Sequence, residues 1–272
     1  MKNFTEKIFR KITQGFGILL AASMILTFSA CESDEQEDTV KDRLWQGSGI
    51  PSIGVGRQKQ EEEPVEQTGG GITICVDPGH GFDDAGASST YVTECDEREL
   101  TLRYALDLRT ELEAMGYKVL MTHDGTAFPK TTEDDGNNKF NPYERAAYVN
   151  SQNVDYFISL HCDSYTDETV GGTRVYFCNT EIKTKDYSED VANAISTSLN
   201  NAFESGMDAR VLEMKPAESY AVIRETYTAG SLIEIGFITS PDDAAKIQDA
   251  EWQSKFVKAV AAGINDYFVS LG

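Results

Sequence analysis

The sequence is poor in positive charge. Its 24 lysines and arginines are outnumbered by 45 aspartates and glutamates, and the formal net charge is −21 at pH 7. A surface this acidic repels nucleic acids and anionic membrane surfaces, because both carry negative charge. We therefore expect neither of them as a partner.

Long apolar runs are also scarce. The longest, residues 15–30, reads "GFGILLAASMILTFSA" and follows a basic start. It is short for a membrane-spanning helix and has the length of a signal-peptide core. It ends in Phe28-Ser29-Ala30-Cys31, which resembles a lipoprotein signal whose cysteine becomes the lipidated first residue. We expect a signal peptide over residues 1–30 and an exported protein that is lipid-anchored through Cys31 to the cell envelope, in the periplasm or at the outer-membrane surface. A plain secretory signal and an anchor helix are the alternatives.

Residues 31–71 lack sustained hydrophobic periodicity. The segment opens with the acidic run "ESDEQED" and continues through glycine-rich and glutamate-rich stretches to "TGGG". Such a composition buries too little apolar surface to fold. We expect a disordered tether between the anchor and a folded domain over residues 72–272.

Four cysteines follow the tether: Cys75, Cys95, Cys162 and Cys178. Export would place them in an oxidising compartment, where disulfides are possible. Four cysteines allow three complete pairings, and the sequence does not choose among them. The alternative is that they are small buried apolar side chains.

The folded domain alternates strand-like and helix-like patterns. We expect strands over 72–76, 117–122, 154–161, 173–177, 221–224 and 232–237, and helices near 97–115, 142–150, 191–203 and 252–268. Asn141, Pro142 and Glu144 have the spacing of a capping box with proline at the first helical position. The alternation predicts an α/β fold with a mostly parallel sheet of about six strands and helices on both faces.

Histidine is rare, with three in the chain, and no HExxH motif is present. His80 follows the first expected strand in "CVDPGHG", and His161 lies at the carboxyl end of the 154–161 strand. Carboxyl ends of parallel strands share one edge of a sheet, where α/β proteins place their sites. Glu97, at the start of the next helix, is the candidate third ligand, because two histidines and one carboxylate form a common zinc site. Taken singly, each histidine is more typical of a polar loop residue.

Glu234 is an acid inside an apolar strand, "LIEIGF". Strand alternation alone favours a side chain that points to solvent. The functional alternative is a general base, because an ionised carboxylate in apolar surroundings is costly unless it is paired.

Five segments occur in the order found in zinc-dependent N-acetylmuramoyl-L-alanine amidases of the Amidase_3 type, which this chain resembles over about residues 72–268. They are "VDPGHGFDDAGA", "ERELTLRYALDLRTELEAMGYKVLMT", "YERAAYVNSQNVDYFISLHCDS", "GGTRVYF" and "SLIEIGFITSPDD". The resemblance implies a six-stranded α/β domain that cleaves the amide between the lactyl group of N-acetylmuramic acid and L-alanine in peptidoglycan.

By motif, the resemblance implies one zinc ion held by His80, Glu97 and His161, with Glu234 as catalytic acid and base. Glu94 is a substitute ligand if the loop register differs. Cys162 stands beside His161 but should face the core, because neighbouring strand residues point to opposite faces. The sequence departs from the family pattern at Phe82, Ala85, His123, Asp163 and Ala229-Gly230, which leaves the details of substrate recognition open.

We expect a monomer that acts on peptidoglycan. Two rival functions remain: another zinc hydrolase of the same polymer, such as a stem-peptide peptidase, and a cell-wall-binding lipoprotein without catalytic activity.

Overall fold

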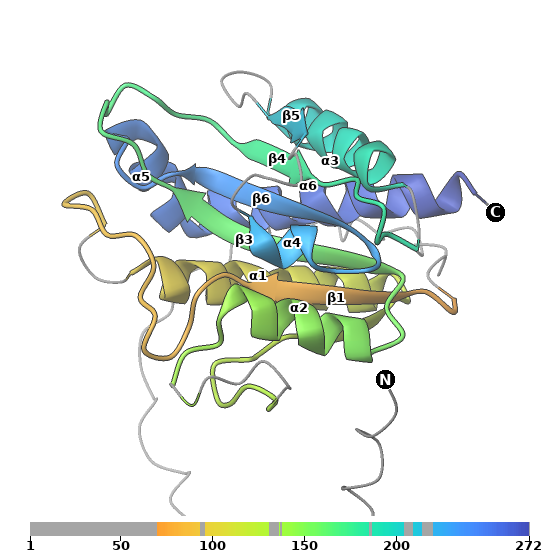
Figure 1. Ribbon diagram of the computed structural model, residues 1–272. Coiled ribbons are helices and arrows are strands. Elements are labelled where there is room, and N and C mark those ends of the chain that lie inside the picture. Colours follow the sequence, from red (N-terminus) through yellow and green to blue (C-terminus); the bar gives the residue numbers. More distant parts are fainter. Residues whose placement is uncertain are drawn as a thin grey trace, which may run out of the picture. The chain divides into compact units, whose positions relative to one another are not determined.

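The computed structural model describes residues 70–92, 96–130, 136, 138–184, 187–203, 209–213 and 220–271 (Figure 1). The expected signal peptide, Cys31 and nearly all of the tether lie outside these residues. No described helix combines the length and the apolar character that a membrane crossing requires.

The described residues form one sheet of six strands with the order β2-β1-β3-β6-β4-β5. The strands are β1 (Thr73–Pro78), β2 (Lys118–Met121), β3 (Tyr156–Asp163), β4 (Arg174–Phe177), β5 (Arg210–Glu213) and β6 (Ala229–Phe237). Four neighbouring pairs are parallel, and only β4 and β6 run antiparallel. The expected mostly parallel α/β sheet is thus confirmed.

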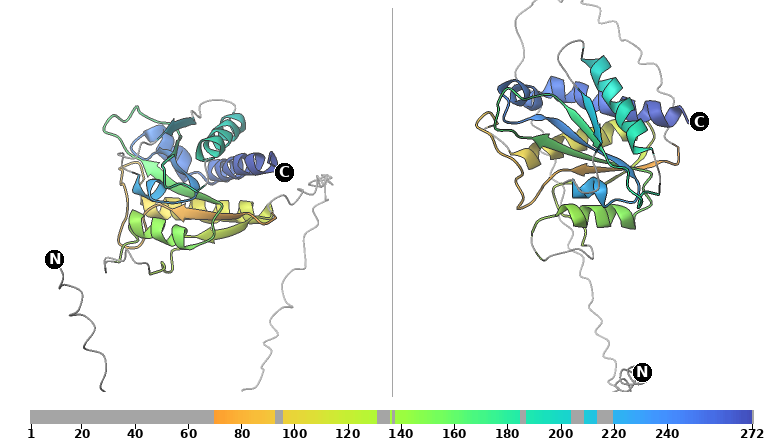
Figure 2. Two further views of the ribbon diagram at one scale, coloured as in Figure 1. Left: turned by 45° about the vertical axis from the view of Figure 1, so that its right-hand side comes forward. Right: turned by 45° about the horizontal axis from the view of Figure 1, so that its top comes forward.

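Helices cover both faces of the sheet (Figures 1 and 2). They are α1 (Glu97–Ala114), α2 (Pro142–Ser151), α3 (Ser188–Ala202), α4 (Ala221–Arg224), α5 (Pro241–Gln248) and α6 (Ala250–Val269). The larger core cluster joins the strands to α1, α3, α5 and α6, and the smaller one joins them to α2 and α4. β1, β3 and β6 are therefore buried on both sides, which explains their continuous apolar runs.

The sequence-based boundaries are close for most elements, and the capping box at the start of α2 is present with both of its hydrogen bonds. The strand expected over Ala221–Arg224 is wrong, because these residues form the short helix α4. Amides of Arg224 and Glu225 donate to the carbonyls four residues earlier, as in an α-helix. A four-residue apolar run carries too little periodicity to separate the two structures. Strand β5 and helix α5 were not predicted.

Candidate metal centre

The buried carboxylate of Asp77, near the end of β1, holds the following loop in place. Asp77 is inaccessible to solvent and accepts hydrogen bonds from Thr122 Oγ1 (2.6 Å), Ser159 Oγ (2.6 Å) and Arg145 Nη1 (3.1 Å). Burial raises the pKa of Asp77, but the charge of Arg145 and the two hydroxyl bonds outweigh it, and the net pKa is lowered. The ionised carboxylate therefore ties β1 to the residue that follows β2, to β3 and to α2 immediately before the turn that carries His80.

The turn itself adopts a backbone conformation that side chains disfavour. His80 has φ +62° and Phe82 has φ +56°, both in the left-handed region. Each such residue costs roughly 1–2 kcal/mol, so surrounding contacts must hold the turn. His123, the third histidine, supplies two of them: its Nε2 donates to the carbonyl oxygens of Pro78 (3.2 Å) and His80 (3.1 Å). His123 is thus a buried support for the loop.

Glu97 is the first residue of α1 and is almost completely buried. The Asp96 side chain accepts from the amide of Glu99, and the Glu99 side chain accepts from that of Asp96, which fixes where the helix starts. The Glu97 carboxylate accepts from two further amides: Ala87 to Oε2 (2.7 Å) and Cys162 to Oε1 (2.9 Å). These contacts, with the positive end of the helix dipole, hold the carboxylate in one orientation.

His161 reaches the same place from the carboxyl end of β3. The pairing of β3 with β6 shifts register between His161 and Asp163, which marks a bulge next to the site. Two glycines make room for the cluster. A Cβ on Gly79 would lie 2.4 Å from His161 Cε1, and one on Gly86, at φ +72°, would lie 2.5 Å from Glu97 Oε2. Neither position can carry a side chain without displacing a candidate ligand.

The structure brings His80, Glu97 and His161 together. His80 Nε2 lies 3.2 Å from Glu97 Oε2, and His161 Nδ1 lies 3.2 Å from Glu97 Oε1. One ligand atom from each of the three residues lies within 4.8 Å of the others. Two ligands about 2.1 Å from one tetrahedral zinc ion would be about 3.4 Å apart, so the donor set and its spacing fit this metal.

The protonation states of Glu97 and His161 also suit a cation. Burial raises the pKa of Glu97, but hydrogen bonds from His161 and His80 outweigh it, and the net pKa lies well below the usual range. Burial lowers the pKa of His161, which favours the neutral imidazole that a metal requires. The Asp84 Oδ2 atom accepts from His80 Nδ1 at 2.9 Å, so a second carboxylate orients the His80 ring.

Glu234 lies beside this cluster in β6, where it pairs in register with His161. Its side chain is 4% exposed, because α2 and α4 cover the face of the sheet to which it points. The hydroxyl of Tyr220 donates to Oε1 at 2.9 Å, whereas the buried Oε2 has no hydrogen-bond partner among the described residues. Burial, followed by the charge of Asp163, raises the pKa of Glu234 to about 8.

The family model described as "N-acetylmuramoyl-L-alanine amidase" (Amidase_3) matches residues 74–266. The chain belongs to this amidase family. The match begins at the second residue of β1, covers the rest of the sheet and contains the four candidate site residues, His80, Glu97, His161 and Glu234.

Among curated relatives of this amidase-family chain are two proteins named "Probable cell wall amidase LytH". The one from Staphylococcus saprophyticus is 31% identical over 197 residues, which are 72% of this chain and 58% of the relative. The one from Staphylococcus epidermidis strain ATCC 12228 is 29% identical over 201 residues, 74% of this chain and 60% of the relative. The chain therefore spans about three fifths of the length of these relatives.

Solved structures share the fold, among them that of an N-acetylmuramoyl-L-alanine amidase. The enzyme from Clostridium difficile 630 aligns with a TM-score of 0.62 at 23% identity, covering 74% of this chain and 98% of its own. Cwp6 from Clostridium difficile aligns with a TM-score of 0.60 at 25% identity, covering 72% of this chain and 29% of its own.

Three cysteines singled out from the sequence place their side chains in the core and not in the candidate centre of this amidase-family chain. Cys162 is buried in the larger core cluster, as expected from strand alternation. Cys75 and Cys178 are buried in the smaller cluster, as apolar side chains would be. Glu94 and Cys95 lie outside the described residues. Sequence analysis did not single out Asp84 or Tyr220, although Asp84 stands four residues after His80 within a quoted segment.

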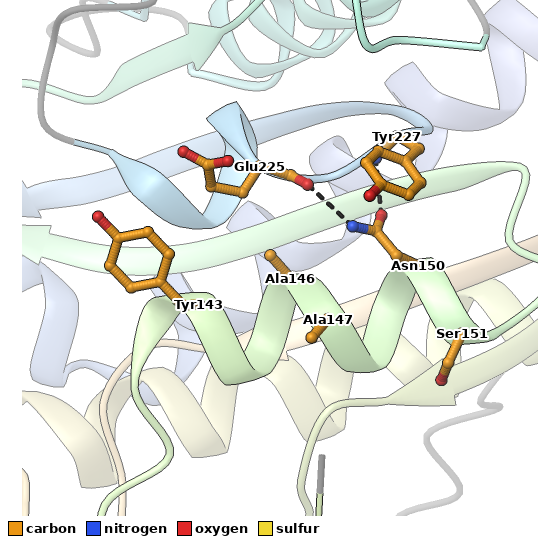
Figure 3. A pocket seen from close by; sticks show the side chains of 7 residues that line it. All are labelled: Tyr143, Ala146, Ala147, Asn150, Ser151, Glu225 and Tyr227. Atoms are coloured by element: carbon orange, nitrogen blue, oxygen red, sulfur yellow. Dashed lines mark hydrogen bonds between the residues drawn. The ribbon is translucent and has the colours of Figure 1, made fainter. Parts of the chain in front are cut away.

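A separate hollow of about 530 Å³ lies between α2 and the segment that follows α4 (Figure 3). Its lining residues are Tyr143, Ala146, Ala147, Asn150, Ser151, Glu225 and Tyr227. The Asn150 side chain bridges its two walls, donating to the Glu225 carbonyl (2.9 Å) and accepting from the Tyr227 amide (2.7 Å). None of the four candidate site residues lines this hollow.

Proposed function

We propose that this protein is a zinc-dependent hydrolase that cleaves the amide bond between the lactyl group of N-acetylmuramic acid and L-alanine in peptidoglycan. The observation that carries the proposal is the cluster of His80, Glu97 and His161 beside a buried glutamate, Glu234, one of whose carboxylate oxygens has no hydrogen-bond partner among the residues that the structure describes. Membership of the amidase family and likeness to cell wall amidases support the choice of substrate.

In this proposal His80, Glu97 and His161 hold the ion. Bound zinc would supply Lewis-acid activation of the water and of the amide carbonyl. The chain's own residues do the rest of the work. Asp84 holds the His80 ring, the amides of Ala87 and Cys162 hold the Glu97 carboxylate, and the bent loop keeps the ligand face of His80 over the sheet edge.

Glu234 moves the proton. Its Oε2 atom takes a proton from the attacking water and later gives it to the leaving L-alanine nitrogen. This exchange requires a carboxyl group whose pKa lies near the working pH, and in the metal-free chain burial raises that of Glu234 to about 8. A carboxylate with a low pKa would accept a proton from the water poorly, and a group with a very high pKa would return the proton to the leaving nitrogen poorly.

Digestion of purified peptidoglycan tests the proposed bond. We expect new L-alanine amino termini without new reducing sugar ends, and we expect a chelator to abolish them and added zinc to restore them. Amino termini other than L-alanine would identify a stem-peptide peptidase instead. Intact peptidoglycan that is merely retained by the protein would identify a binding protein without catalytic activity.

Glu234→Gln separates catalysis from metal binding. The substitution keeps the size of the side chain and removes its ability to exchange a proton, so turnover should fall by about 10²- to 10⁴-fold. Zinc content, measured by elemental analysis, should stay at one ion per chain. Turnover close to wild type would refute the role of Glu234, and loss of zinc would make it a ligand.

We further propose that the protein is exported and anchored through Cys31, so that the acidic tether lets the domain reach the wall. Metabolic labelling with a fatty-acid probe should mark the wild-type chain and not Cys31→Ser. Equal labelling of both would contradict the anchor.

A further inference from the structure

We propose that Tyr220 is a positioning residue of the amidase reaction: its hydroxyl holds Oε1 of Glu234, so that Oε2 alone exchanges protons with the substrate. This inference rests on the proposed function of Glu234. Tyr220 precedes α4, and its hydroxyl lies 2.9 Å from Oε1 in a part-buried setting.

The contact with Tyr220 gives the two carboxylate oxygens of Glu234 different surroundings. Oε1 is held by a hydrogen-bond donor, while Oε2 is buried and has no partner in the described part of the chain. A buried carboxylate oxygen without a partner is costly, and such atoms in folded proteins call for an explanation. An oxygen kept ready for a proton supplies one, because a donor on both oxygens would hold the group as a carboxylate that accepts a proton poorly.

Tyr220 is well placed to hold one orientation. Its ring packs against that of Tyr176 on β4, with centroids 4.9 Å apart, and β4 is the antiparallel neighbour of β6. The helix that follows is anchored through Val222 and Ile223, which are buried in the core cluster shared with α2. The packing of Tyr220 therefore fixes the position of its hydroxyl, and the hydrogen bond from this hydroxyl restricts the side-chain torsions of Glu234.

Tyr220→Phe removes the donor and keeps the ring. We expect kcat for release of L-alanine amino termini to fall by about 10- to 100-fold while KM changes less than about twofold, because substrate binding does not use this hydroxyl. Zinc content should stay at one ion per chain. Tyr227→Phe, in the hollow between α2 and the segment that follows α4, is the matched control, and its kinetic constants should equal those of the wild type. Unchanged kcat in Tyr220→Phe would overturn the proposal, and so would a rise in KM at constant kcat.

A double-mutant cycle on unfolding tests the contact without any turnover. The cycle compares wild type, Tyr220→Phe, Glu234→Met and the double variant, all free of metal, in urea denaturation. If the hydroxyl holds Oε1, the single substitutions should be coupled by about tenfold in the equilibrium constant for unfolding. Additive effects would mean that Tyr220 acts only as packing, and the inference would fall. Coupling in a protein that releases no L-alanine termini would instead sink the proposed reaction while the contact stands.

Discussion

Replacing Glu234 by glutamine should make the metal-free protein more stable at pH 7 and above, and the difference should grow as the pH rises toward 8. The carboxyl group has a raised pKa in the folded chain, about 8 against an ordinary value of 4.5. The folded state therefore binds this proton more tightly than the unfolded state. Stability is unaffected by the group below about pH 4.5, falls as pH rises from there, and levels off above about pH 8, where both states are ionised.

The size of the effect follows from the distance between the two pKa values. At pH 7 the pH lies 2.5 units above the pKa of the carboxyl group in the unfolded chain, whereas the same group in the folded chain is still mostly protonated. This difference lowers the free energy of unfolding by roughly 3 kcal/mol, at 1.36 kcal/mol per unit. Glutamine has no such penalty. Its amide nitrogen would lack a partner where Oε2 now lies, at a cost of about 1–3 kcal/mol, but that cost does not change with pH.

Urea denaturation of both proteins in EDTA at pH 5, 6, 7 and 8 isolates the titration. The difference in free energy of unfolding, Glu234→Gln minus wild type, should rise by roughly 3 kcal/mol between pH 5 and 8. The control Glu251→Gln removes a surface carboxylate that is paired with Lys255 at 3.2 Å, and its difference should vary little. A pH-independent difference for Glu234→Gln would refute the burial of the ionisable group and, with it, the argument for a base with a raised pKa.

Three further perturbations test the frame around the metal ligands. Asp77→Asn leaves the Arg145 guanidinium buried and unpaired, so the free energy of unfolding in urea should fall by about 3–5 kcal/mol; a loss under 1 kcal/mol would contradict the buried pair. Gly86→Ala forces a Cβ against Glu97 Oε2 at a positive φ, and zinc affinity measured by chelator competition should drop; unchanged affinity would mean that the ligand can move. Asp84→Asn should weaken zinc binding by about 10- to 100-fold in calorimetry with the unfolding midpoint preserved, and equal affinity would remove its orienting role.

The elements that the sequence predicts correctly have either strong hydrophobic periodicity or a recognisable helix start. The long helix α1 starts at Glu97 because Asp96 and Glu99 form a capping box, and α2 starts after Asn141 for the same reason. Parallel crossovers then bring the ends of β1 and β3 to one edge. The sequence could not separate a four-residue apolar helix from a strand at Ala221–Arg224, because one turn of helix and a short buried strand share the same composition.

The candidate ligands could be predicted because strand ends and a helix start converge by topology alone. The residues that hold these ligands in place could not be predicted. Tyr220 contacts Glu234 across a connection whose path no local pattern specifies. The His123 contacts depend on a left-handed turn at His80, a conformation that sequence pattern does not indicate for a histidine. Supporting contacts of this kind depend on long-range packing, whereas the ligands depend on the order of the elements.

The burial of Glu234 depends both on strand alternation and on the helices that cover the sheet. Alternation correctly separates its face from that of Ile233 and Ile235, which pack in the larger core cluster. The prediction that this face points to solvent is wrong, because α2 and α4 cover it and leave the Glu234 side chain 4% exposed. A central strand of a doubly covered sheet has no solvent face, so any acid within it is buried at a cost that something must offset. Interpreting a lone carboxylate in such a strand as a candidate proton carrier therefore requires two facts, the place of the strand in the sheet and the presence of helices on both faces. The alternation of strands and helices predicts the second fact, whereas the central place of β6 follows from the strand order of the folded sheet.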